Sequence, residues 1–320
     1  MLTGRFAPSP TGRMHLGNVY SALLSWLSAK SKGGEWILRI EDIDPQRSKE
    51  VFARQIEDDL RWLGLDWDRG GVDDPLYVQS RRGHIYEQYL GRLAELGMTY
   101  PCYCSRADIL ATQAPHESDG RVVYKGTCRP DGTPEKNEWL NLRRAEWLSL
   151  RKTEMGKTPA IRIMVPDRDI TFTDLHYGTQ TVNLAHECGD FILRRSDGAW
   201  AYQLAVVVDD ALMGVTEVVR GCDLLLSSPQ QIFMHELLGF RAPQFCHLPL
   251  LCNEQHQRLC KRDKSLDMGE LRKHHTAPEI IGLLAYKTGI TDCLQPVTPQ
   301  ELISVFDWDK VPSENQILRI

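Results

Sequence analysis

The sequence lacks the long apolar segment that a membrane-spanning protein needs. Its longest apolar runs, such as residues 204–208, fall far short of the roughly 20 residues that cross a bilayer. The first ten residues contain no basic stretch followed by an apolar one, so they lack the pattern typical of a secretory signal peptide. We therefore expect a cytoplasmic protein that does not contact a membrane.

An excess of positive charge is also missing. The chain has 38 basic and 43 acidic residues and a net charge of -5, so it lacks the positive balance typical of many nucleic-acid binders. We expect no DNA partner, and any contact with RNA must use local basic patches. Repeats and low-complexity segments are absent, and 42% apolar with 25% charged residues is an ordinary globular composition.

The nine cysteines show no pattern of disulfide pairs. Most are scattered along the second half of the chain, as expected for free thiols in a reducing compartment. These scattered cysteines are Cys188, Cys222, Cys246, Cys252, Cys260 and Cys293. Only Cys102, Cys104 and Cys128 form a cluster in sequence, which sets them apart as candidate metal ligands.

A length of 320 residues suggests two domains, or one large domain with an insertion. The first hundred residues alternate strand and helix patterns, which favours a mostly parallel sheet with helices on both faces and ligands at the carboxyl ends of its strands. Residues 100–189 are turn-rich and read as an insertion, and the alternation resumes with an expected strand at 191–193. We predict an α/β catalytic domain formed by 1–99 and 190–264, the insertion at 100–189, and a short helical tail at 265–320.

The stretch from Arg5 to Asn18 carries the strongest chemical signal. It combines a strand, a loop rich in proline and glycine, and the N-terminus of a helix, with His15 at the junction. Backbone N–H groups and an imidazole at such a junction can bind an anionic group, for which a nucleotide phosphate is suited. An ordinary strand-to-helix turn is the alternative interpretation.

Residues 5–12 (RFAPSPTG) and 15–18 (HLGN) resemble the HIGH region of class I glutamyl-tRNA synthetases. Residues 39–44 resemble the second block of that family, and residues 201–210 with 219–223 resemble the third. Residues 247–251 followed by 258–262 resemble the KMSKS region. These matches run from residue 4 to 262 in the family's order, and they imply a Rossmann-like catalytic domain.

Glutamate as a substrate explains the charges in these blocks. It carries one ammonium and two carboxylates, which call for a carboxylate and for guanidinium groups in the protein. Arg5, Glu41 and Arg220 supply those charges, and Ser9 and Tyr202 offer hydroxyl groups. The resemblance implies the same five positions. Taken singly, Glu41 also fits a surface acid and Arg220 a salt-bridged strand end.

ATP is the second substrate that the resemblance implies, bound with Mg²⁺. The corresponding positions are His15, Gly17, Asn18 and Lys261, and the KMSKS-like loop consists of Arg258, Leu259, Cys260, Lys261 and Arg262. An alternative register starts at Lys261 and includes Lys264. In the chosen register Arg258 replaces a lysine and Cys260 replaces a serine, and a thiol is the weaker hydrogen-bond donor.

A structural zinc ion would stabilise the fold of the turn-rich insertion. Cys102, Cys104 and Cys128 provide three thiolates, and chemistry alone leaves the fourth ligand open between Tyr124 and His116. The resemblance implies Tyr124, since the glutamyl-tRNA synthetase-like proteins have a similar Cys-x-Cys and Tyr-x3-Cys site.

Only 58 residues follow Arg262, whereas full-length glutamyl-tRNA synthetases continue with a long helical anticodon-binding region. The chain thus resembles their truncated paralogues, the glutamyl-Q tRNA(Asp) synthetases, and Val206 agrees, because the full-length enzymes have asparagine there. The resemblance implies a ligase that activates L-glutamate and attaches it to the queuosine base at the wobble position of tRNA(Asp). We expect a monomer.

Three alternatives stay open from the sequence. One is a truncated glutamyl-tRNA synthetase that charges a tRNA 3' end, and another is an inactive paralogue that binds RNA or glutamate. The third is a nucleotidyltransferase of the same fold that acts on a small molecule. A basic helical segment expected at 138–152 reads as a solvated face, with contact to RNA phosphates as the alternative.

Overall fold

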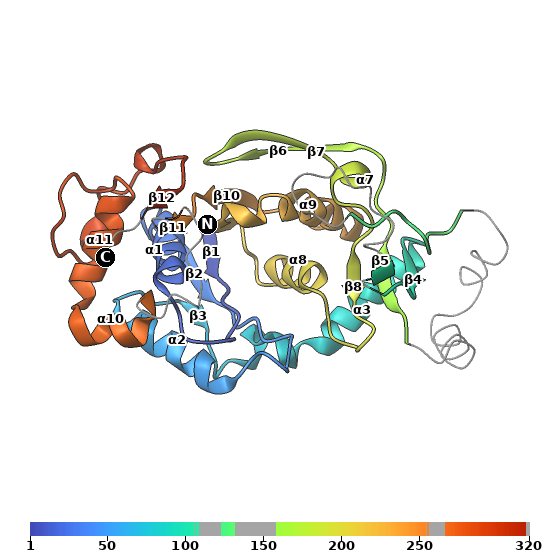
Figure 1. The fold of residues 1–320 in the computed structure, drawn as a ribbon, viewed down its shortest axis with the longest axis horizontal. Coiled ribbons are helices and arrows are strands. Elements are labelled where there is room, and N and C mark those ends of the chain that lie inside the picture. Colours follow the sequence, from blue (N-terminus) through green and yellow to red (C-terminus); the bar gives the residue numbers. More distant parts are fainter. Residues whose placement is uncertain (106, 109–122, 132–157, 254, 256–265, 318–320) are drawn as a thin grey trace.

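The computed structural model describes residues 1–105, 107–108, 123–131, 158–253, 255 and 266–317 (Figure 1). Strands β1 (Thr3–Phe6), β2 (Glu35–Leu38) and β3 (Arg69–Gly70) form a parallel sheet in that order. Strands β9 (Glu217–Gly221) and β10 (Gln244–Leu248) form a second parallel pair. The amide N of Thr216 donates to the carbonyl O of Thr3 at 2.9 Å, so β9 lies beside β1 and the strands make one layer.

Both faces of this layer are buried, as the alternating pattern predicts. Successive residues of a strand point to opposite faces, and in β2 Trp36 and Leu38 join one apolar cluster whereas Ile37 joins another. In β9 Val219 and Val218 divide in the same way. The expected parallel α/β layer with two covered faces is therefore confirmed.

Helix α1 (Leu16–Lys30) packs on the face of the layer that carries Trp36, Leu38 and Val219. Nearly all of the side chains that α1 buries there are apolar. The helix ends just before Gly33, whose φ of 63° is a left-handed conformation that favours glycine. Four further helices follow the sequence expectation closely. They are α2 (Glu50–Trp62), α3 (Gly83–Glu95), α8 (Tyr202–Leu212) and α9 (Ser227–Leu238).

The insertion contains a small antiparallel sheet and a hairpin. The sheet has the order β4 (Thr99–Cys102), β5 (Ala160–Ile163) and β8 (Ile192–Arg194). The expected strand at 191–193 thus exists as β8, but it pairs with β5 in antiparallel orientation and does not continue the parallel layer. Its apolar residues identify a strand, whereas its partner depends on the tertiary fold.

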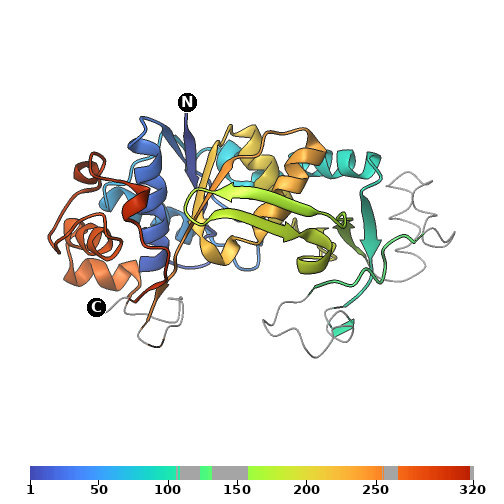
Figure 2. The same cartoon turned by 90° about the horizontal axis from the view of Figure 1, so that it is seen from above.

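The hairpin consists of β6 (Asp169–Asp174) and β7 (Gly178–Asn183), followed by the short helix α7 (Leu184–Glu187). It lies along β10 and α9 and crosses the middle of the molecule in Figure 2. The amide N of Leu175 donates to the carbonyl O of Phe245 at 2.8 Å, and the rings of Phe172 and Phe245 contact edge to face. The hairpin is thereby fixed to the parallel layer.

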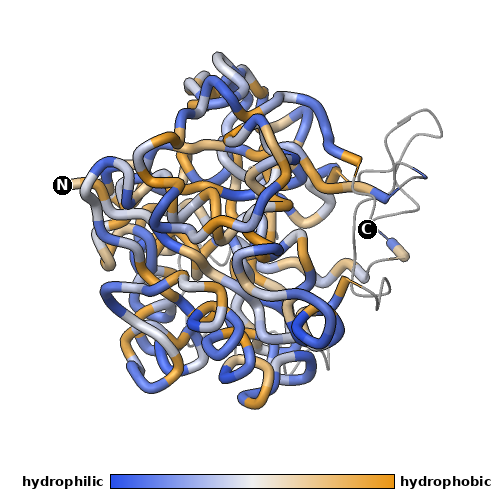
Figure 3. The backbone as a smooth tube through the Cα atoms, turned by 90° about the vertical axis from the view of Figure 1, so that its left-hand side faces the viewer, coloured by the Kyte–Doolittle hydropathy of each residue, from blue (hydrophilic) through white to orange (hydrophobic). Residues whose placement is uncertain are grey.

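The C-terminal part of the chain packs on α1. It contains α10 (Met268–His274), α11 (Ala277–Lys287) and α12 (Pro299–Leu302), and β12 (Gln316–Ile317) pairs in parallel with β11 (Leu251–Cys252). Buried residues such as Ile281 and Leu284 belong to the same apolar cluster as α1. Figure 3, viewed from the side of these helices, shows apolar and polar stretches alternating along the chain.

Two predictions from the local sequence were wrong. The pair Ser228-Pro229 predicts Ser228 as the N-cap of a helix, and apolar residues at 85, 89, 93 and 96 predict Leu96 on the apolar face of a helix. Helix α9 begins at Ser227 with Leu226 as its N-cap, so Ser228 is not the cap that the Ser-Pro pattern predicts. Leu96, expected on the apolar face of the third helix, follows the end of α3 and is 55% exposed. In the part of the chain that the structure describes, no helix has the length and apolar character needed to cross a membrane.

Candidate active site

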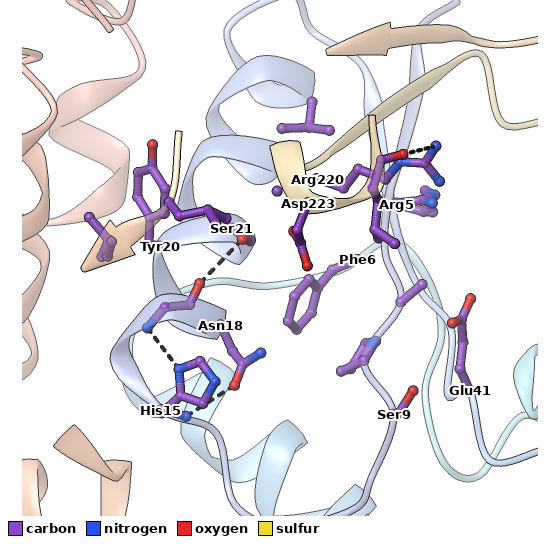
Figure 4. A pocket seen from close by; sticks show the side chains of 18 of the residues that line it. Arg5, Phe6, Ser9, His15, Asn18, Tyr20, Ser21, Glu41, Arg220 and Asp223 are labelled. Carbon is purple, nitrogen blue, oxygen red and sulfur yellow. Dashed lines mark hydrogen bonds between the residues drawn. The ribbon is translucent and has the colours of Figure 1, made fainter. Parts of the chain in front are cut away.

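A cavity of about 420 Å³ opens at the carboxyl ends of β1, β2 and β9, where the sheet topology predicts a ligand. Its volume is within the range of small-molecule sites. All five expected glutamate-binding residues line it, together with three of the expected ATP-binding residues. They are Arg5, Ser9, Glu41, Tyr202 and Arg220, with His15, Gly17 and Asn18. The structure thus brings together residues from four separate segments of the sequence, 5–18, 41, 202 and 220. Figure 4 shows Arg5, Ser9, His15, Asn18, Glu41 and Arg220 around the cavity.

The N-terminus of α1 forms one side of the cavity. The ring Nδ1 of His15 accepts a hydrogen bond from Gly17 N at 3.1 Å, and Asn18 Oδ1 accepts from His15 N at 3.1 Å. Because Nδ1 is an acceptor, the neutral ring carries its proton on Nε2. The first turn of α1 contains no acidic side chain. The positive end of the helix dipole therefore faces the cavity, where it favours an anionic ligand.

Buried charges form the opposite side. Asp210 accepts from Arg39 Nη1 at 2.6 Å and from Arg5 Nε at 3.4 Å, and Glu41 accepts from Arg39 Nη2 at 3.0 Å. Arg39 is fully buried, whereas Arg5 and Glu41 reach the cavity. Among the described residues, Asp210 is the one hydrogen-bond partner of the Arg5 side chain, so the terminal nitrogens of Arg5 are available to a ligand.

The pKa values of the two acids move in opposite directions. Burial raises the pKa of Glu41 above its ordinary value, despite the lowering effect of the Arg39 and Arg5 charges. Burial also acts to raise the pKa of Asp210, but the charges of Arg39 and Arg5 outweigh it and the pKa of Asp210 is lowered. Asp210 is therefore the permanent counter-charge, and Glu41 gains from a cationic ligand.

Arg220 is the second guanidinium on the cavity wall, and its whole side chain is held in place. It donates from Nη1 to Tyr202 Oη at 3.2 Å and to Gln231 Oε1 at 2.9 Å. It also donates from Nη2 to Ser228 Oγ at 2.8 Å and from Nε to His247 Nε2 at 3.1 Å. Nη2 also donates to the carbonyl O of Leu224 at 3.4 Å, so all five N–H groups have protein acceptors and a carboxylate bound here must share or displace one of them.

The KMSKS-like loop, Arg258 to Arg262, lies outside the described residues, and so do His116 and the segment 138–152. The residues that flank the loop are described. Leu251 lines the cavity, and Asp267 forms a β-bridge with His15. The segment that carries Lys261 therefore leaves and re-enters the described structure at the edge of the cavity.

The cysteine cluster lies apart from this cavity, at the end of β4. The Sγ atoms of Cys102, Cys104 and Cys128 lie within 4.8 Å of one another, and those of Cys104 and Cys128 are 3.6 Å apart. The Tyr124 hydroxyl is 3.5 Å from Cys102 Sγ and 3.9 Å from Cys104 Sγ. The hydrogen bond between Cys102 and Cys128 lowers the pKa of the Cys102 thiol and raises that of Cys128, so one thiolate is favoured in the cluster before any metal binds.

Some residues of the site carried no assigned role in the sequence. Arg39, Asp210 and His247 lie within the recognised blocks, and the structure shows that they hold the residues that line the cavity. A signal was present, because Arg39 interrupts an apolar strand and Asp210 ends an apolar helix. Val206, by contrast, is buried in the core of α8 and does not line the cavity.

The sequence matches the family "tRNA synthetases class I (E and Q), catalytic domain" over residues 1–319. It is 50% identical to a glutamyl-Q tRNA(Asp) synthetase of Symbiobacterium thermophilum, with 98% of this chain and 95% of that protein covered. A protein of the same name from Nitratidesulfovibrio vulgaris is 44% identical, with 98% and 94% covered.

Among solved structures, the fold is similar to that of a glutamate tRNA ligase from Elizabethkingia meningosepticum in complex with its amino acid. The TM-score is 0.80 and the identity 29%, with 99% of this chain aligned. This chain spans 66% of the length of that ligase.

Proposed function

The chain belongs to the class I tRNA synthetases of the E and Q type, and from this premise we propose that it activates L-glutamate with ATP and transfers it to the queuosine base at the wobble position of tRNA(Asp). A ligase of the glutamate–tRNA type is what the family and the relatives support directly. The queuosine acceptor rests on the name that the relatives share over 98% of this chain. The single observation that carries the proposal is the cavity, in which two arginines and one glutamate face a helix N-terminus.

Glutamate fits the charges of the deep side of the cavity. Its ammonium pairs with Glu41, whose buried carboxylate lines the cavity and is held from behind by Arg39. Its two carboxylates bind Arg5 and Arg220, with the hydroxyls of Ser9 and Tyr202 as further contacts. Two guanidinium groups for two carboxylates explain why glutamate is preferred to the neutral side chain of glutamine.

ATP binds on the side of α1. Its phosphates meet the amide groups near Gly17, the His15 ring and, from the loop, Lys261, with Mg²⁺ carried by the nucleotide. A carboxylate oxygen of glutamate then attacks the α-phosphorus in line, the bond to pyrophosphate breaks, and glutamyl-adenylate forms. No side chain becomes covalently attached, so catalysis consists of positioning and of stabilising negative charge.

In the second step a hydroxyl oxygen of the queuosine ring attacks the acyl carbon of the mixed anhydride. The bond to AMP breaks and the glutamyl ester forms. A wobble base is accessible because bases in single-stranded loops can be splayed out of the stack. We further propose a cytoplasmic monomer, with a domain division at residues 100–189 and at 265.

A structural zinc ion fits the cysteine cluster. Two sulfurs bound to a tetrahedral zinc lie about 3.8 Å apart when each Zn–S bond is about 2.3 Å, close to the 3.6 Å between Cys104 and Cys128. Cys102 and the Tyr124 oxygen complete the donor set.

Metal analysis should find about one zinc per chain. Cys128→Ser should lose this zinc, whereas Cys293→Ser, at an exposed cysteine, should retain it. Far less than one zinc in the unaltered chain contradicts this site.

Glutamate-dependent ATP–pyrophosphate exchange without tRNA is the decisive test. Exchange under this condition supports the proposed function, since full-length glutamyl-tRNA synthetases require tRNA for activation. If exchange appears only with total tRNA, the alternative of an RNA-dependent charging enzyme is favoured. If it never appears, the chain is an inactive paralogue. Transfer of labelled glutamate to tRNA(Asp) with queuosine, and not to tRNA(Asp) with guanosine at that position, tests the acceptor.

A further inference from the structure

A line of buried side chains connects the β6–β7 hairpin to Arg220 on the cavity wall. Asp174 Oδ2, at the end of β6, lies 2.6 Å from His247 Nδ1 on β10. His247 Nε2 in turn accepts from Arg220 Nε at 3.1 Å. His247 and the Asp174 carboxylate are fully buried, so these contacts exclude water.

The chemistry of the three groups fixes the tautomer of His247. The guanidinium can only donate, so Nε2 must carry a lone pair toward Arg220, and the ring proton is on Nδ1. That proton is donated to Asp174, whose carboxylate also accepts from the backbone amides of His247, His176 and Tyr177. Asp174 therefore cannot turn away from the ring.

The surroundings of His247 keep it neutral. The ring stacks on Phe245, and Ser228 Oγ is 3.3 Å from Nε2. Burial lowers the pKa of His247 and the Arg220 charge adds to this, while the hydrogen bond to Asp174 opposes it. Among the described residues, Asp174 and Arg220 are the two charged groups in contact with the ring.

We propose that Asp174 and His247 are positioning residues, which set the orientation of Arg220 and thereby the affinity of the cavity for the carboxylate of glutamate. Tyr202, Gln231, Ser228 and the carbonyl O of Leu224 accept from the two terminal nitrogens of Arg220, and among the described residues His247 alone accepts from Nε. Without His247 the buried Nε–H loses its acceptor, and the plane of the guanidinium is set by the contacts of its terminal nitrogens alone. This inference rests on the proposed function, and it makes the hairpin part of the glutamate site.

Two substitutions of the same histidine separate the contributions of its ring nitrogens. His247→Gln places an amide oxygen near the position of Nε2 and retains an acceptor for Arg220. His247→Asn retains a donor toward Asp174 but leaves Arg220 Nε without its acceptor. In pyrophosphate exchange, H247N should raise the KM for glutamate by about tenfold or more, since the buried Nε–H of Arg220 loses its acceptor. H247Q, which keeps an acceptor there, should have a KM for glutamate close to that of the unaltered protein.

The KM for ATP should stay within about twofold in both variants, because only the glutamate side of the site is altered. His235→Asn serves as the control, since His235 is buried on α9 but does not line the cavity. Thermal melts verify that all variants fold. Folded H247N with an unchanged KM for glutamate, or H247N and H247Q with equal KM values, overturns the inference.

The tautomer provides a readout that does not depend on turnover. In a spectrum of the protein labelled with ¹⁵N-histidine, the signal lost in H247Q should be that of a neutral ring protonated on Nδ1, and Asp174→Asn should shift it. A proton on Nε2 overturns the inference even in an active enzyme. If the unaltered chain binds no glutamate by calorimetry, the proposed function fails. A proton on Nδ1 would then still support the contact of His247 with Arg220, and only the identity of the carboxylate ligand would be wrong.

Discussion

Single charged residues in the cavity depend on partners behind them. Asp210 is the clearest case, because one buried carboxylate faces both Arg39 and Arg5. Removing one member of a buried ion pair leaves an uncompensated charge, which costs about 3 to 5 kcal/mol. The geometry of the substrate site and the stability of the fold are therefore linked at this residue.

Asp210→Asn should lower the free energy of unfolding by about 3 kcal/mol or more, because Arg5 loses its one ion-pair partner among the described residues and Arg39 loses the shortest of its three. Urea denaturation measures the change.

The stability that Asp210 contributes also depends on pH. Since the pKa of Asp210 is lowered in the folded protein, its contribution to the free energy of unfolding is present above the ordinary pKa of 3.8 and is lost as the pH falls through the lowered pKa. Asp73→Asn, at an exposed partner of Arg54, should change stability by less than about 0.5 kcal/mol. Equal effects of the two substitutions contradict the argument.

The protonation of the Glu41 carboxylate should determine how the affinity for glutamate depends on pH. Because burial raises the pKa of Glu41, its carboxylate becomes protonated at a higher pH than usual, and the substrate ammonium then loses its partner. The KM for glutamate should rise as the pH falls through the raised pKa of Glu41, which lies above the ordinary value of 4.5, and should level off at higher pH. Pyrophosphate exchange over this range measures the effect.

Glu41→Gln is the matching control for this pH dependence. It should raise the KM at every pH, by about 30-fold, and remove the acid-side increase. An acid-side increase that persists in E41Q identifies another group as the one that titrates.

At the residue scale the sequence predicted which side chains surround the cavity, because eight of them lie in blocks that resemble a known family. It did not predict the residues that hold them. Asp174 and His247 are far apart in sequence, and neither spacing nor periodicity indicates that a hairpin brings them to Arg220.

At the element scale, periodicity identified the helices, since α1, α2 and α3 each have a buried stripe. Periodicity was less informative about the residue at which a helix begins and about which strands pair with each other. The start of α9 differs from the Ser-Pro expectation because the Ser228 hydroxyl accepts from Arg220 inside the protein and so is not available as a cap. The strand β8 was expected, but its antiparallel pairing with β5 was not.

Two helical glycines provide a test of element packing. A Cβ added at Gly282 of α11 would lie 1.9 Å from the carbonyl O of Gln295, so the helix and the segment after it are in backbone contact. Gly282→Ala should destabilise the protein by about 1 to 3 kcal/mol. Gly91 of α3 has no atom within 4 Å of an added Cβ, and Gly91→Ala should stabilise by about 0.5 to 1 kcal/mol. Thermal melts measure both, and a shift of the same sign contradicts the packing argument.

At the scale of the whole molecule, the cavity lies where separate parts of the chain converge. The wall with Arg5 and His15 comes from the first segment, and the wall with Arg220 from β9. Leu251 also lines the cavity and Asp267 forms a β-bridge with His15, so described residues before and after the KMSKS-like loop belong to the same region. Activation of glutamate therefore requires that these parts stay packed as one unit.

The C-terminal helices are part of that unit, because several of their residues belong to the apolar cluster of α1. Met268 and Leu271 of α10 belong to this cluster, and the members after residue 275, in the helices and the segments between them, are Ile280, Ile281, Leu284, Ala285, Ile290, Leu302 and Val311, each less than 5% exposed. Each buried isoleucine or leucine contributes roughly 1.5 to 3 kcal/mol, and a whole domain is stable by only about 5 to 15 kcal/mol. The sequence suggested a tail, yet its contribution is comparable with the entire stability of a domain.

A chain that ends after residue 275 should consequently fail to fold, since α1 then exposes apolar side chains that α11 and α12 cover. We expect insoluble protein, or a soluble form without a cooperative thermal transition by circular dichroism. A chain that ends after Ser313 is the control, because it retains all seven core residues and loses only the short strand β12. It should unfold cooperatively, with a midpoint lower by a few degrees. If the shorter chain melts like the full one, these helices are an appendage, and the cavity is supported by the parallel layer alone.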